Sequence, residues 1–102
     1  MTFSRVCAAD EIPDGKLVSF WVEDMEVLLV HAGGALRAYD GICPHESFAL
    51  VDGVFDGQTI TCIGHQWMFS AANGRGVNPP NCKLEAFPVK VEDGDVYVDL
   101  DP

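Results

Sequence analysis

The stretch "CPHESFALVDGVFDGQTITCIGH", residues 43–65, holds two cysteines and two histidines in two short pairs. Cys43 and His45 form a Cys-x-His pair. After sixteen intervening residues, Cys62 and His65 form a Cys-x-x-His pair. The whole chain has only four cysteines and three histidines, so chance rarely produces such a pattern. Each pair supplies one sulfur and one nitrogen ligand. The spacing therefore predicts a metal centre held by two loops, each contributing both kinds of ligand.

Two kinds of metal centre use these ligands. A structural zinc site commonly takes two cysteines from one turn and two histidines from another segment. In a Rieske [2Fe–2S] centre two thiolates hold one iron and two imidazoles hold the other. One Cys and one His from each loop fit the second arrangement, because both loops must then reach both irons. A Rieske cluster is the main interpretation, and a colourless zinc site is the alternative.

Length and composition agree with a small metal-stabilised domain. The 102 residues predict a single domain, 1–102, and 48% of them are hydrophobic, which is enough for a small core. The first ten residues lack the pattern of a signal peptide, and the longest apolar run, "VLLV" at 27–30, is too short to span a membrane. We therefore expect a cytoplasmic protein, in which cysteines stay reduced and serve metal binding rather than disulfides.

The chain is strongly acidic. Sixteen acidic residues against six basic ones give a formal net charge of −10. Nucleic-acid binding is excluded as a function, because a phosphate backbone is bound by Lys and Arg. Two interpretations of the acidity stay open: a surface that keeps the protein soluble, or one that steers it toward basic protein partners.

Alternating apolar and polar residues predict an all-β protein. The expected strands are 16–22, 25–31, 36–40, 58–62, 87–91 and 95–100. The Gly33-Gly34 and Asp93-Gly94 pairs are placed to form tight hairpin turns. No window of twelve residues has a helical period. The fold class expected is an antiparallel sandwich or small barrel.

Residues 41–57 and 70–82 fit no strand pattern and are expected to be long irregular connections, which in small domains often carry function. The Cys-His pairs lie on or beside them. Pro44 restricts φ in the first pair, and Gly64 permits a tight turn in the second.

The residues around the pairs have simpler expected roles. Phe69 is expected to pack in the core, whereas Trp67 either packs there, shields the cluster or contacts a partner. Cys7 and Cys82 are expected to be ordinary residues rather than ligands. His31 is expected to serve a hairpin rather than act as a base.

The motifs "CPH" and "CIGH" resemble the binding motif of the Rieske family. The similarity extends through "HQWMF", "GRGVNPPNC" and "LEAFPVKVEDGDVYVDL" and covers nearly the whole chain. In these segments the chain resembles the Rieske ferredoxin component of bacterial toluene and related aromatic monooxygenases. The resemblance implies a small Rieske-type β domain with one [2Fe–2S] cluster at the tip of two loops. The ligands it implies are Cys43, His45, Cys62 and His65.

The resemblance also implies a role. Such ferredoxins pass single electrons from a flavin-containing NADH reductase to a di-iron hydroxylase, which inserts the oxygen. We therefore expect no catalytic activity, transient protein partners, and a monomer when free. Three other functions stay open: the ferredoxin of a ring-hydroxylating dioxygenase, the small Rieske subunit of a reductase such as nitrite reductase, and a zinc-stabilised binding module.

The sequence departs from the Rieske proteins of respiratory complexes at four positions. Their two additional cysteines fall at Phe48 and Gly64, so the loop disulfide is absent. Their serine and tyrosine, whose hydroxyls bond the cluster sulfurs, fall at Trp67 and Phe69. Fewer hydrogen bonds to the cluster leave its reduced, more negative form less stabilised. We expect a potential toward the low end of the Rieske range of about −150 to +300 mV.

Overall fold

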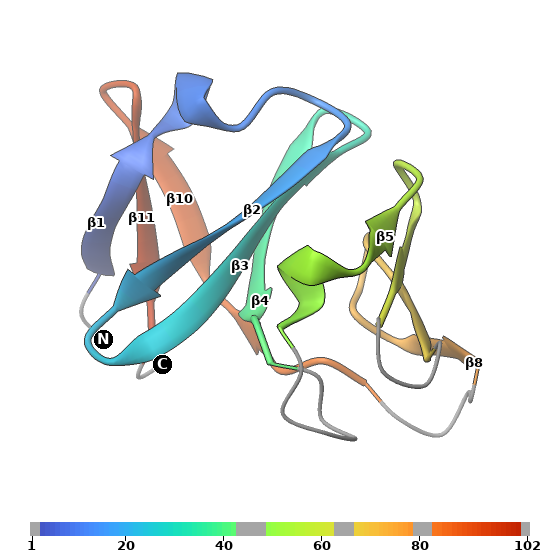
Figure 1. The fold of residues 1–102 in the computed structure, drawn as a ribbon. Helices are drawn as coiled ribbons and strands as arrows, with labels where there is room; N and C mark the ends of the chain where they lie inside the picture. Colours follow the sequence, from blue (N-terminus) through green and yellow to red (C-terminus); the bar gives the residue numbers. More distant parts are fainter. Residues whose placement is uncertain (1–2, 43–48, 63–66, 79–82, 101–102) are drawn as a thin grey trace.

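The structure is a computed structural model that describes residues 3–42, 49–62, 67–78 and 83–100. Its described elements are short strands and two single-turn 3₁₀ helices, arranged in three sheets (Figure 1). The strands are β1 (Phe3–Ala8), β2 (Lys16–Val22), β3 (Met25–Ala32), β4 (Ala35–Asp40), β5 (Val54–Phe55), β6 (Thr59–Thr61), β7 (Met68–Ser70), β8 (Gly76–Asn78), β9 (Ala86–Phe87), β10 (Val89–Glu92) and β11 (Asp95–Asp99). The 3₁₀ helices are η1 (Ala9–Glu11) and η2 (Leu50–Asp52).

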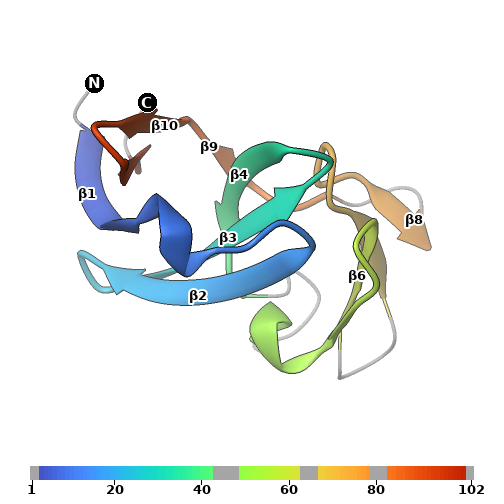
Figure 2. The same cartoon turned by 90° about the horizontal axis from the view of Figure 1, so that it is seen from above.

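Every pairing among the described strands is antiparallel. The terminal sheet has the order β1-β11-β10, the central sheet β2-β3-β4-β9, and the distal sheet β5-β6-β7-β8. Figure 2 shows, from above, the central sheet between the other two. The expected all-β antiparallel fold is confirmed, with three sheets making up the architecture.

The central strand β3 explains the apolar run "VLLV". Successive side chains of a strand point to opposite faces, and both faces of β3 are covered. Val27 and Leu29 pack with residues of the terminal sheet in one core, while Leu28 and Val30 pack toward the distal sheet in a second core. All four side chains are at most 1% exposed. A strand buried on both faces needs a continuous apolar sequence rather than an alternating one.

The distal sheet belongs to a segment that leaves and re-enters the central sheet at one place. β4 pairs with β9 through Ala38–Phe87 and Tyr39–Ala86, and the Asp40 N–H donates to the Glu85 carbonyl at 2.9 Å. Residues 41–85, hereafter the inserted unit, therefore begin and end beside each other. This segment contains both Cys-His pairs.

The hairpins expected from sequence are present. Gly33 and Gly34 have φ of 61° and 79°, and Asp93 and Gly94 have φ of 53° and 83°. The strands expected at 16–22, 25–31 and 36–40 match β2, β3 and β4 within one residue at each end. Strand β1, which pairs with β11, was missed.

Two sequence-based expectations about segments were wrong. Residues 41–57 and 70–82 are not irregular throughout, because they contain η2, β5 and β8. The single strand expected at 87–91 is divided by Pro88 into β9 in the central sheet and β10 in the terminal sheet. Pro88 has no N–H to donate, but its carbonyl accepts from the Asp99 N–H at 3.0 Å. The chain changes sheets at this residue.

The two ends of the described chain lie side by side, since Phe3 pairs with Asp99, the residue before Leu100. Among the described residues no helix has the length and apolar character needed to cross a membrane.

Candidate metal centre

One of the four predicted ligands, Cys62, lies within the described residues. Cys43, His45 and His65 lie outside them, as do Pro44, Phe48, Gly64 and Cys82. Within the described part of the chain, no group of three or more His, Cys, Asp or Glu side chains could hold a metal ion. The site is therefore described from Cys62 and from the residues where the chain enters and leaves the undescribed segments.

Cys62 directly follows β6 and is only 2% exposed. It belongs to the core between the central and distal sheets, with Ile60 and Phe69. Its backbone N–H donates to the Trp67 carbonyl at 2.7 Å, which continues the β6–β7 pairing of Thr61 with Met68. The hairpin that carries the second Cys-His pair is thus closed by a hydrogen bond at the cysteine itself.

The residues that flank the first pair, which we call its stem, are also fixed by backbone hydrogen bonds. The Gly41 N–H donates to the Glu26 carbonyl of β3, and the Gly41 carbonyl accepts from the Leu50 N–H, both at 2.8 Å. Ile42 and Ala49 form an antiparallel bridge. The chain therefore enters residues 43–48 and leaves them at one anchored place.

The Asp40 carboxylate accepts from the Ile42 N–H at 3.1 Å. A bond from an Asp side chain to the N–H two residues on forms an Asx turn. Asp40 thus turns the chain out of β4 toward the first pair.

A third stem, around residues 79–82, is also fixed by backbone hydrogen bonds. Arg75 and Lys83 form an antiparallel bridge around residues 79–82, and the Leu84 N–H donates to the Gly74 carbonyl at 2.7 Å. Gly74 has φ of +73°, and a Cβ at this position would lie 2.8 Å from the Tyr39 ring. A side chain here would both strain the backbone and collide with the core.

One core holds the three stems together. Leu50 follows the first segment, Cys62 precedes the second and Leu84 follows the third, and all three belong to the same buried cluster. In Figure 1 the ends of β4, β6 and β8 lie toward the lower edge of the view. The fold therefore gathers the bases of all three stems, and with them the positions where both Cys-His pairs begin.

Gly53 is a further residue on which the site depends, and sequence reasoning missed it. Its N–H donates to the Leu50 carbonyl at 3.0 Å. A Cβ at this position would overlap the Thr61 carbonyl oxygen, one residue before Cys62. Its φ of −84° is ordinary, so packing rather than backbone conformation requires glycine. The sequence around Gly53 shows only a turn-like "DG" and carries no sign of this contact.

The two aromatic residues after Cys62, Trp67 and Phe69, differ in how deeply they are buried. Phe69 is fully buried, which confirms its core role. Trp67 is partly buried and packs against the same core. Packing is therefore one role of Trp67, and a contact with a partner stays a prediction.

Cys7 lies in the other core, between the terminal and central sheets. Its thiol is buried, and desolvation, aided by the nearby Glu11 carboxylate, raises its pKa to about 11 from 9.0. A cysteine that resists ionisation is a poor metal ligand, because the thiolate is the ligand form. Cys7 is a core residue, as expected.

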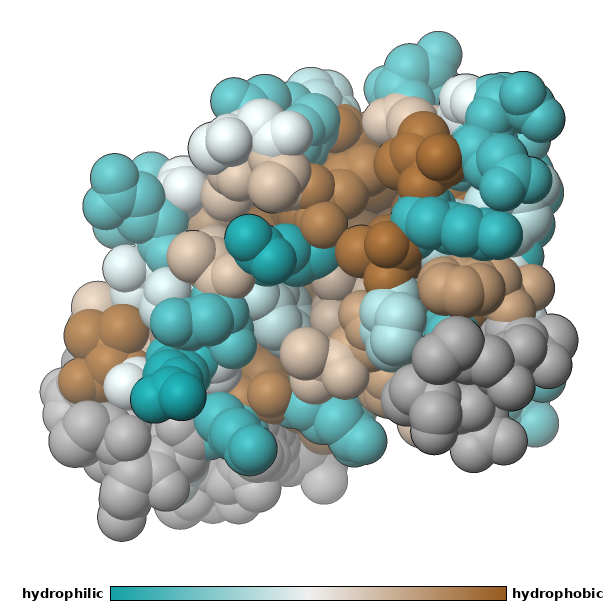
Figure 3. Space-filling model, turned by 180° about the vertical axis from the view of Figure 1, so that it is seen from behind, coloured by the Kyte–Doolittle hydropathy of each residue, from teal (hydrophilic) through white to brown (hydrophobic). Residues whose placement is uncertain are grey.

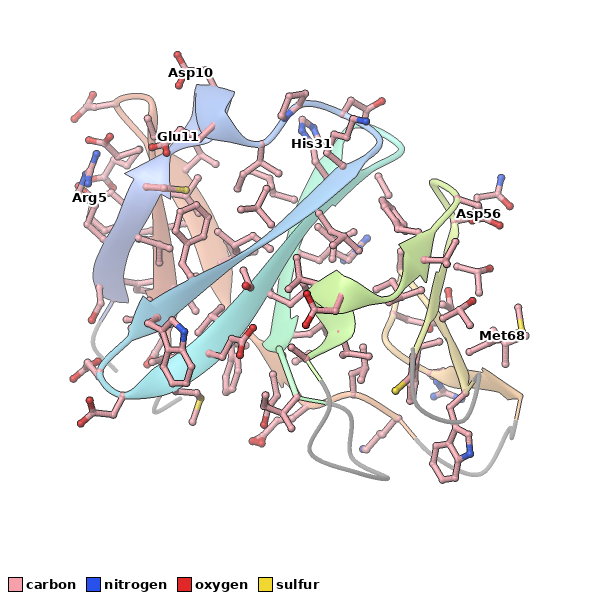
Figure 4. The ribbon with its side chains drawn as sticks, viewed as in Figure 1. Arg5, Asp10, Glu11, His31, Asp56 and Met68 are labelled. Atoms are coloured by element: carbon pink, nitrogen blue, oxygen red, sulfur yellow. The ribbon has the colours of Figure 1, made fainter. Side chains whose placement is uncertain are left out.

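His31 lies at the end of β3 beside the β3–β4 turn. Its Nδ1 donates to the Ile12 carbonyl at 2.7 Å, and its Nε2 lies 3.8 Å from the Asp14 carboxylate. Figure 4 shows His31 and Asp10 at the upper edge, opposite the edge toward which β4, β6 and β8 end. His31 therefore joins two turns far from Cys62 and from the stems of the Cys-His pairs, in keeping with its expected structural role.

A separate hollow of about 370 Å³ lies between β4, β9 and residues 72–73. Its lining is mainly apolar, including Leu36, Phe87 and Val89, with Arg37 among the lining residues. Figure 3 shows apolar side chains bordered by hydrophilic ones on the rear face. Cys62, the predicted ligand within the described residues, does not line this hollow.

Comparison with known families decides the identity of the fold. The model of the Rieske [2Fe-2S] domain matches residues 2–88. The chain belongs to the Rieske [2Fe-2S] domain family. Members of this family hold a [2Fe–2S] cluster with two Cys and two His ligands. The main sequence interpretation, a Rieske rather than a zinc centre, is confirmed at the level of the family.

Known relatives of this Rieske domain are ferredoxins of oxygenase systems. It is 46% identical over 98 residues to the alkene monooxygenase ferredoxin component of Xanthobacter autotrophicus (strain ATCC BAA-1158 / Py2), covering 95% of this chain and 80% of the relative. It is 31% identical to the biphenyl dioxygenase ferredoxin subunit of Pseudomonas sp. (strain KKS102), covering 98% and 94%.

A solved structure shows the same fold. The likeness is to a chain in the complex of reduced oxygenase and oxidised ferredoxin of carbazole 1,9a-dioxygenase, with a TM-score of 0.83 and 28% identity. The match covers 94% of this chain and 91% of that one. As expected from sequence, the protein is a Rieske ferredoxin, an electron-transfer component rather than a catalytic subunit.

The residues of this Rieske domain fit the family's cofactor. Cys62 is held in a core that excludes water, and the stems of both Cys-His pairs are anchored by main-chain hydrogen bonds around that core. The two Cys-His pairs of the inserted unit offer two thiol and two imidazole donors. This is the donor set that a Rieske cluster requires.

Proposed function

We propose that Cys43, His45, Cys62 and His65 hold one [2Fe–2S] cluster in a single Rieske domain, residues 1–102. The buried position of Cys62 and the common core beneath the stems support this set. When bound, the cluster supplies a reversible one-electron couple. The chain's own residues supply the rest: main-chain hydrogen bonds orient the ligand segments, and the core formed by Leu50, Ile60 and Phe69 excludes water beneath them.

We further propose that this ferredoxin receives electrons from an NADH-dependent flavoprotein reductase. It passes them to the di-iron hydroxylase of a multicomponent aromatic monooxygenase of the toluene type. The observation that carries the proposal is the 46% identity to a monooxygenase ferredoxin over nearly the whole chain. The carrier is cytoplasmic, monomeric when free, and binds each partner only transiently.

A second candidate is the ferredoxin of a ring-hydroxylating dioxygenase. Relatives from biphenyl and naphthalene dioxygenase systems are 31–34% identical, and the structural likeness to a carbazole dioxygenase component favours the same role. Both candidates use the same cofactor and differ in the terminal oxygenase.

The deciding experiment supplies the reduced ferredoxin to each type of oxygenase. We expect rapid oxidation of the ferredoxin by a di-iron hydroxylase of a toluene-type system and slow oxidation by a Rieske dioxygenase, measured by stopped-flow absorbance. The opposite order would establish the dioxygenase role.

Two measurements test the cofactor separately. The EPR spectrum of the reduced protein identifies the Rieske cluster, and a colourless zinc-loaded protein would contradict it. We expect a midpoint potential toward the low end of the range of about −150 to +300 mV. A value above about +100 mV, well inside that range, would contradict the expectation that the absent hydroxyl donors lower the potential.

A further inference from the structure

Trp21 has the largest exposed fraction among the exposed large hydrophobic residues in the described part of the chain. It is 70% exposed on β2, an edge strand of the central sheet. An aromatic side chain of this size buries a large apolar area when covered, which is why Trp is enriched at the energetic centres of protein interfaces. The position of Trp21 on the sheet indicates which kind of partner would cover its side chain.

Strand register places Trp21 in one row with the stem of the first Cys-His pair. Trp21 pairs with Glu26 of β3, and the Glu26 carbonyl accepts from the Gly41 N–H at 2.8 Å. Neighbouring strands lie about 4.8 Å apart, so Trp21 is about 10 Å from Gly41 across the sheet. Gly41 precedes Cys43 by two residues.

The row also fixes the face on which Trp21 lies. Directly opposed residues of an antiparallel pair project to the same face. Glu26 alternates in phase with Leu28 and Val30, which pack toward the distal sheet. Trp21 therefore lies on the face of the central sheet that carries the inserted unit.

The surroundings of Trp21 are acidic. Glu23 and Asp24 form the β2–β3 turn, and Glu26 follows on β3. Residues 17–36 contain no Lys or Arg. Glu23 and Asp24 are exposed, whereas Glu26 is only 9% exposed. An exposed indole beside two exposed carboxylates is complementary to an apolar pocket bordered by basic side chains.

We propose that Trp21, Glu23 and Asp24, the Trp21 patch, form part of the docking surface for the oxygenase component. The partner presents an apolar pocket bordered by Lys or Arg, and the proposal rests on the electron-carrier function proposed above. A standard interface covers about 800 Å² on each protein, equivalent to a disc about 16 Å in radius. A partner centred on Gly41, in the stem of the first Cys-His pair, therefore reaches Trp21.

Charge argues against other occupants. A second copy of this chain would bring the same carboxylates face to face, with a net charge of −10 on each molecule. Like charges opposed across an interface are unfavourable. An anionic lipid surface would be repelled for the same reason. A basic protein surface is the occupant that the charges favour.

The first test measures affinity for the oxygenase component of the protein's own system by titration calorimetry. We expect Trp21→Ala to raise the Kd about tenfold or more, because the indole fills a pocket. Val91→Ala is the matched control, since Val91 is 50% exposed on β10 of the terminal sheet, and its Kd should stay unchanged. The EPR spectrum and melting temperature of Trp21→Ala should match the wild type.

The second test uses charge. Asp24 has φ of +67°, which Asn tolerates well, so Asp24→Asn removes a carboxylate with little strain. We expect this variant to associate more slowly at low salt and to depend less on ionic strength. Asp10→Asn, at the opposite edge of the molecule in Figure 4, is the control and should behave like the wild type.

The outcomes separate this proposal from the one it rests on. A wild-type protein that neither binds nor reduces any oxygenase would overturn the electron-carrier function. Normal binding by the wild type with an unchanged Kd for Trp21→Ala would overturn the Trp21 patch alone. A concentration-dependent dimer of the free chain that Trp21→Ala abolishes would assign the patch to self-association and also overturn it.

Discussion

At the scale of single residues, the chain places the proposed ligand Cys62 and the packing residue Cys7 in different cores. Cys62 lies at the base of the inserted unit, where the stems of both Cys-His pairs meet. Cys7 lies in the other core, on the far side of the central sheet. The same residue type therefore occupies two environments, and only Cys62 lies beside the stems of the Cys-His pairs.

The ligand set gives the first prediction. Replacing either ligand histidine with Ala should abolish the Rieske EPR spectrum, because one iron loses a nitrogen donor. Replacing either ligand cysteine with Ser should abolish or severely weaken cluster binding. The four variants are His45→Ala, His65→Ala, Cys43→Ser and Cys62→Ser. Cys7→Ser and Cys82→Ser are the controls and should keep the spectrum. Loss of the cluster in the Cys7 variant would show that the sulfur set is wrong.

The raised pKa of Cys7 predicts a loss of stability in alkali. The folded protein keeps the thiol protonated up to about pH 11, whereas the unfolded chain releases the proton near pH 9. The unfolded state therefore binds fewer protons between these values, and stability falls as pH rises through them. A difference of two pKa units corresponds to about 2–3 kcal/mol.

Urea titrations at pH 8 and pH 11 on wild type and Cys7→Ala measure this effect. The variant should be less stable at pH 8, because it leaves a small cavity, but should lose less stability between the two pH values. Equal losses in both proteins would show that Cys7 does not titrate in this range.

At the scale of elements, sequence predicts best those strands that are long and are bounded by tight turns. β2 and β4 are long enough to show a pattern, and tight turns such as Gly33-Gly34 mark their ends. The ligand pairs are equally visible, because metal chemistry restricts both residue type and spacing. Sequence therefore predicted the family, the main hairpins and the proposed ligands.

The shorter elements have no such signal. β5 and β9 have two residues each, which is too few to display a period of two, and they form because longer neighbouring strands offer hydrogen bonds. The change of sheet at Pro88 depends on how the central and terminal sheets pack. Contacts such as Gly53 with Thr61 depend on tertiary structure alone and leave no trace in the local sequence.

Gly53→Ala tests the support of the second ligand pair. The added methyl group would collide with the Thr61 carbonyl oxygen, so β5 and β6 must move apart next to Cys62. We expect a lower iron content per chain and destabilisation of about 1–3 kcal/mol, the usual range for forcing extra atoms into a packed site. Iron analysis and thermal melting measure both effects.

Gly57→Ala is a useful comparison within the same hairpin. A Cβ at this position meets no atom within 4 Å, although its φ of +97° disfavours a side chain. This variant should lose stability through backbone strain while keeping its iron content. Equal loss of iron in both variants would show that the contact of Gly53 with Thr61 has no special role.

At the scale of the whole molecule, a buried side-chain hydrogen bond adds to the backbone bonds that link the central sheet to the inserted unit. The Tyr39 hydroxyl on β4 donates to the Ala71 carbonyl after β7 at 2.8 Å. Burial raises the pKa of Tyr39, so the hydroxyl remains a donor well into alkali. Tyr39→Phe leaves a buried carbonyl without this donor, which costs about 1–3 kcal/mol.

Hydrogen exchange locates that loss. We expect faster exchange in the inserted unit of Tyr39→Phe and little change in the terminal sheet. Faster exchange throughout the molecule would show instead that the two parts unfold as one.

The net charge of −10 predicts a salt-dependent encounter with partners. Charges on separate proteins attract over about 8 Å at physiological ionic strength and over less at higher salt. The association rate with the oxygenase should therefore fall clearly as salt is added, while the midpoint potential changes little. Stopped-flow measurements across a salt series test this, and a rate indifferent to salt would leave solubility as the role of the acidity.

The return of the inserted unit to its starting point has a consequence for how the protein matures. β4 and β9 pair directly with each other, and the core shared by the terminal and central sheets contains no described residue of the inserted unit. We therefore expect these two sheets and their shared core to form without iron. Iron–sulfur assembly enzymes would then act on a chain whose terminal and central sheets are already folded, rather than on an unfolded chain. The same arrangement would allow the inserted unit to be replaced by another segment. The replacement must cover Leu28 and Val30, the apolar residues of the central sheet that the inserted unit now buries.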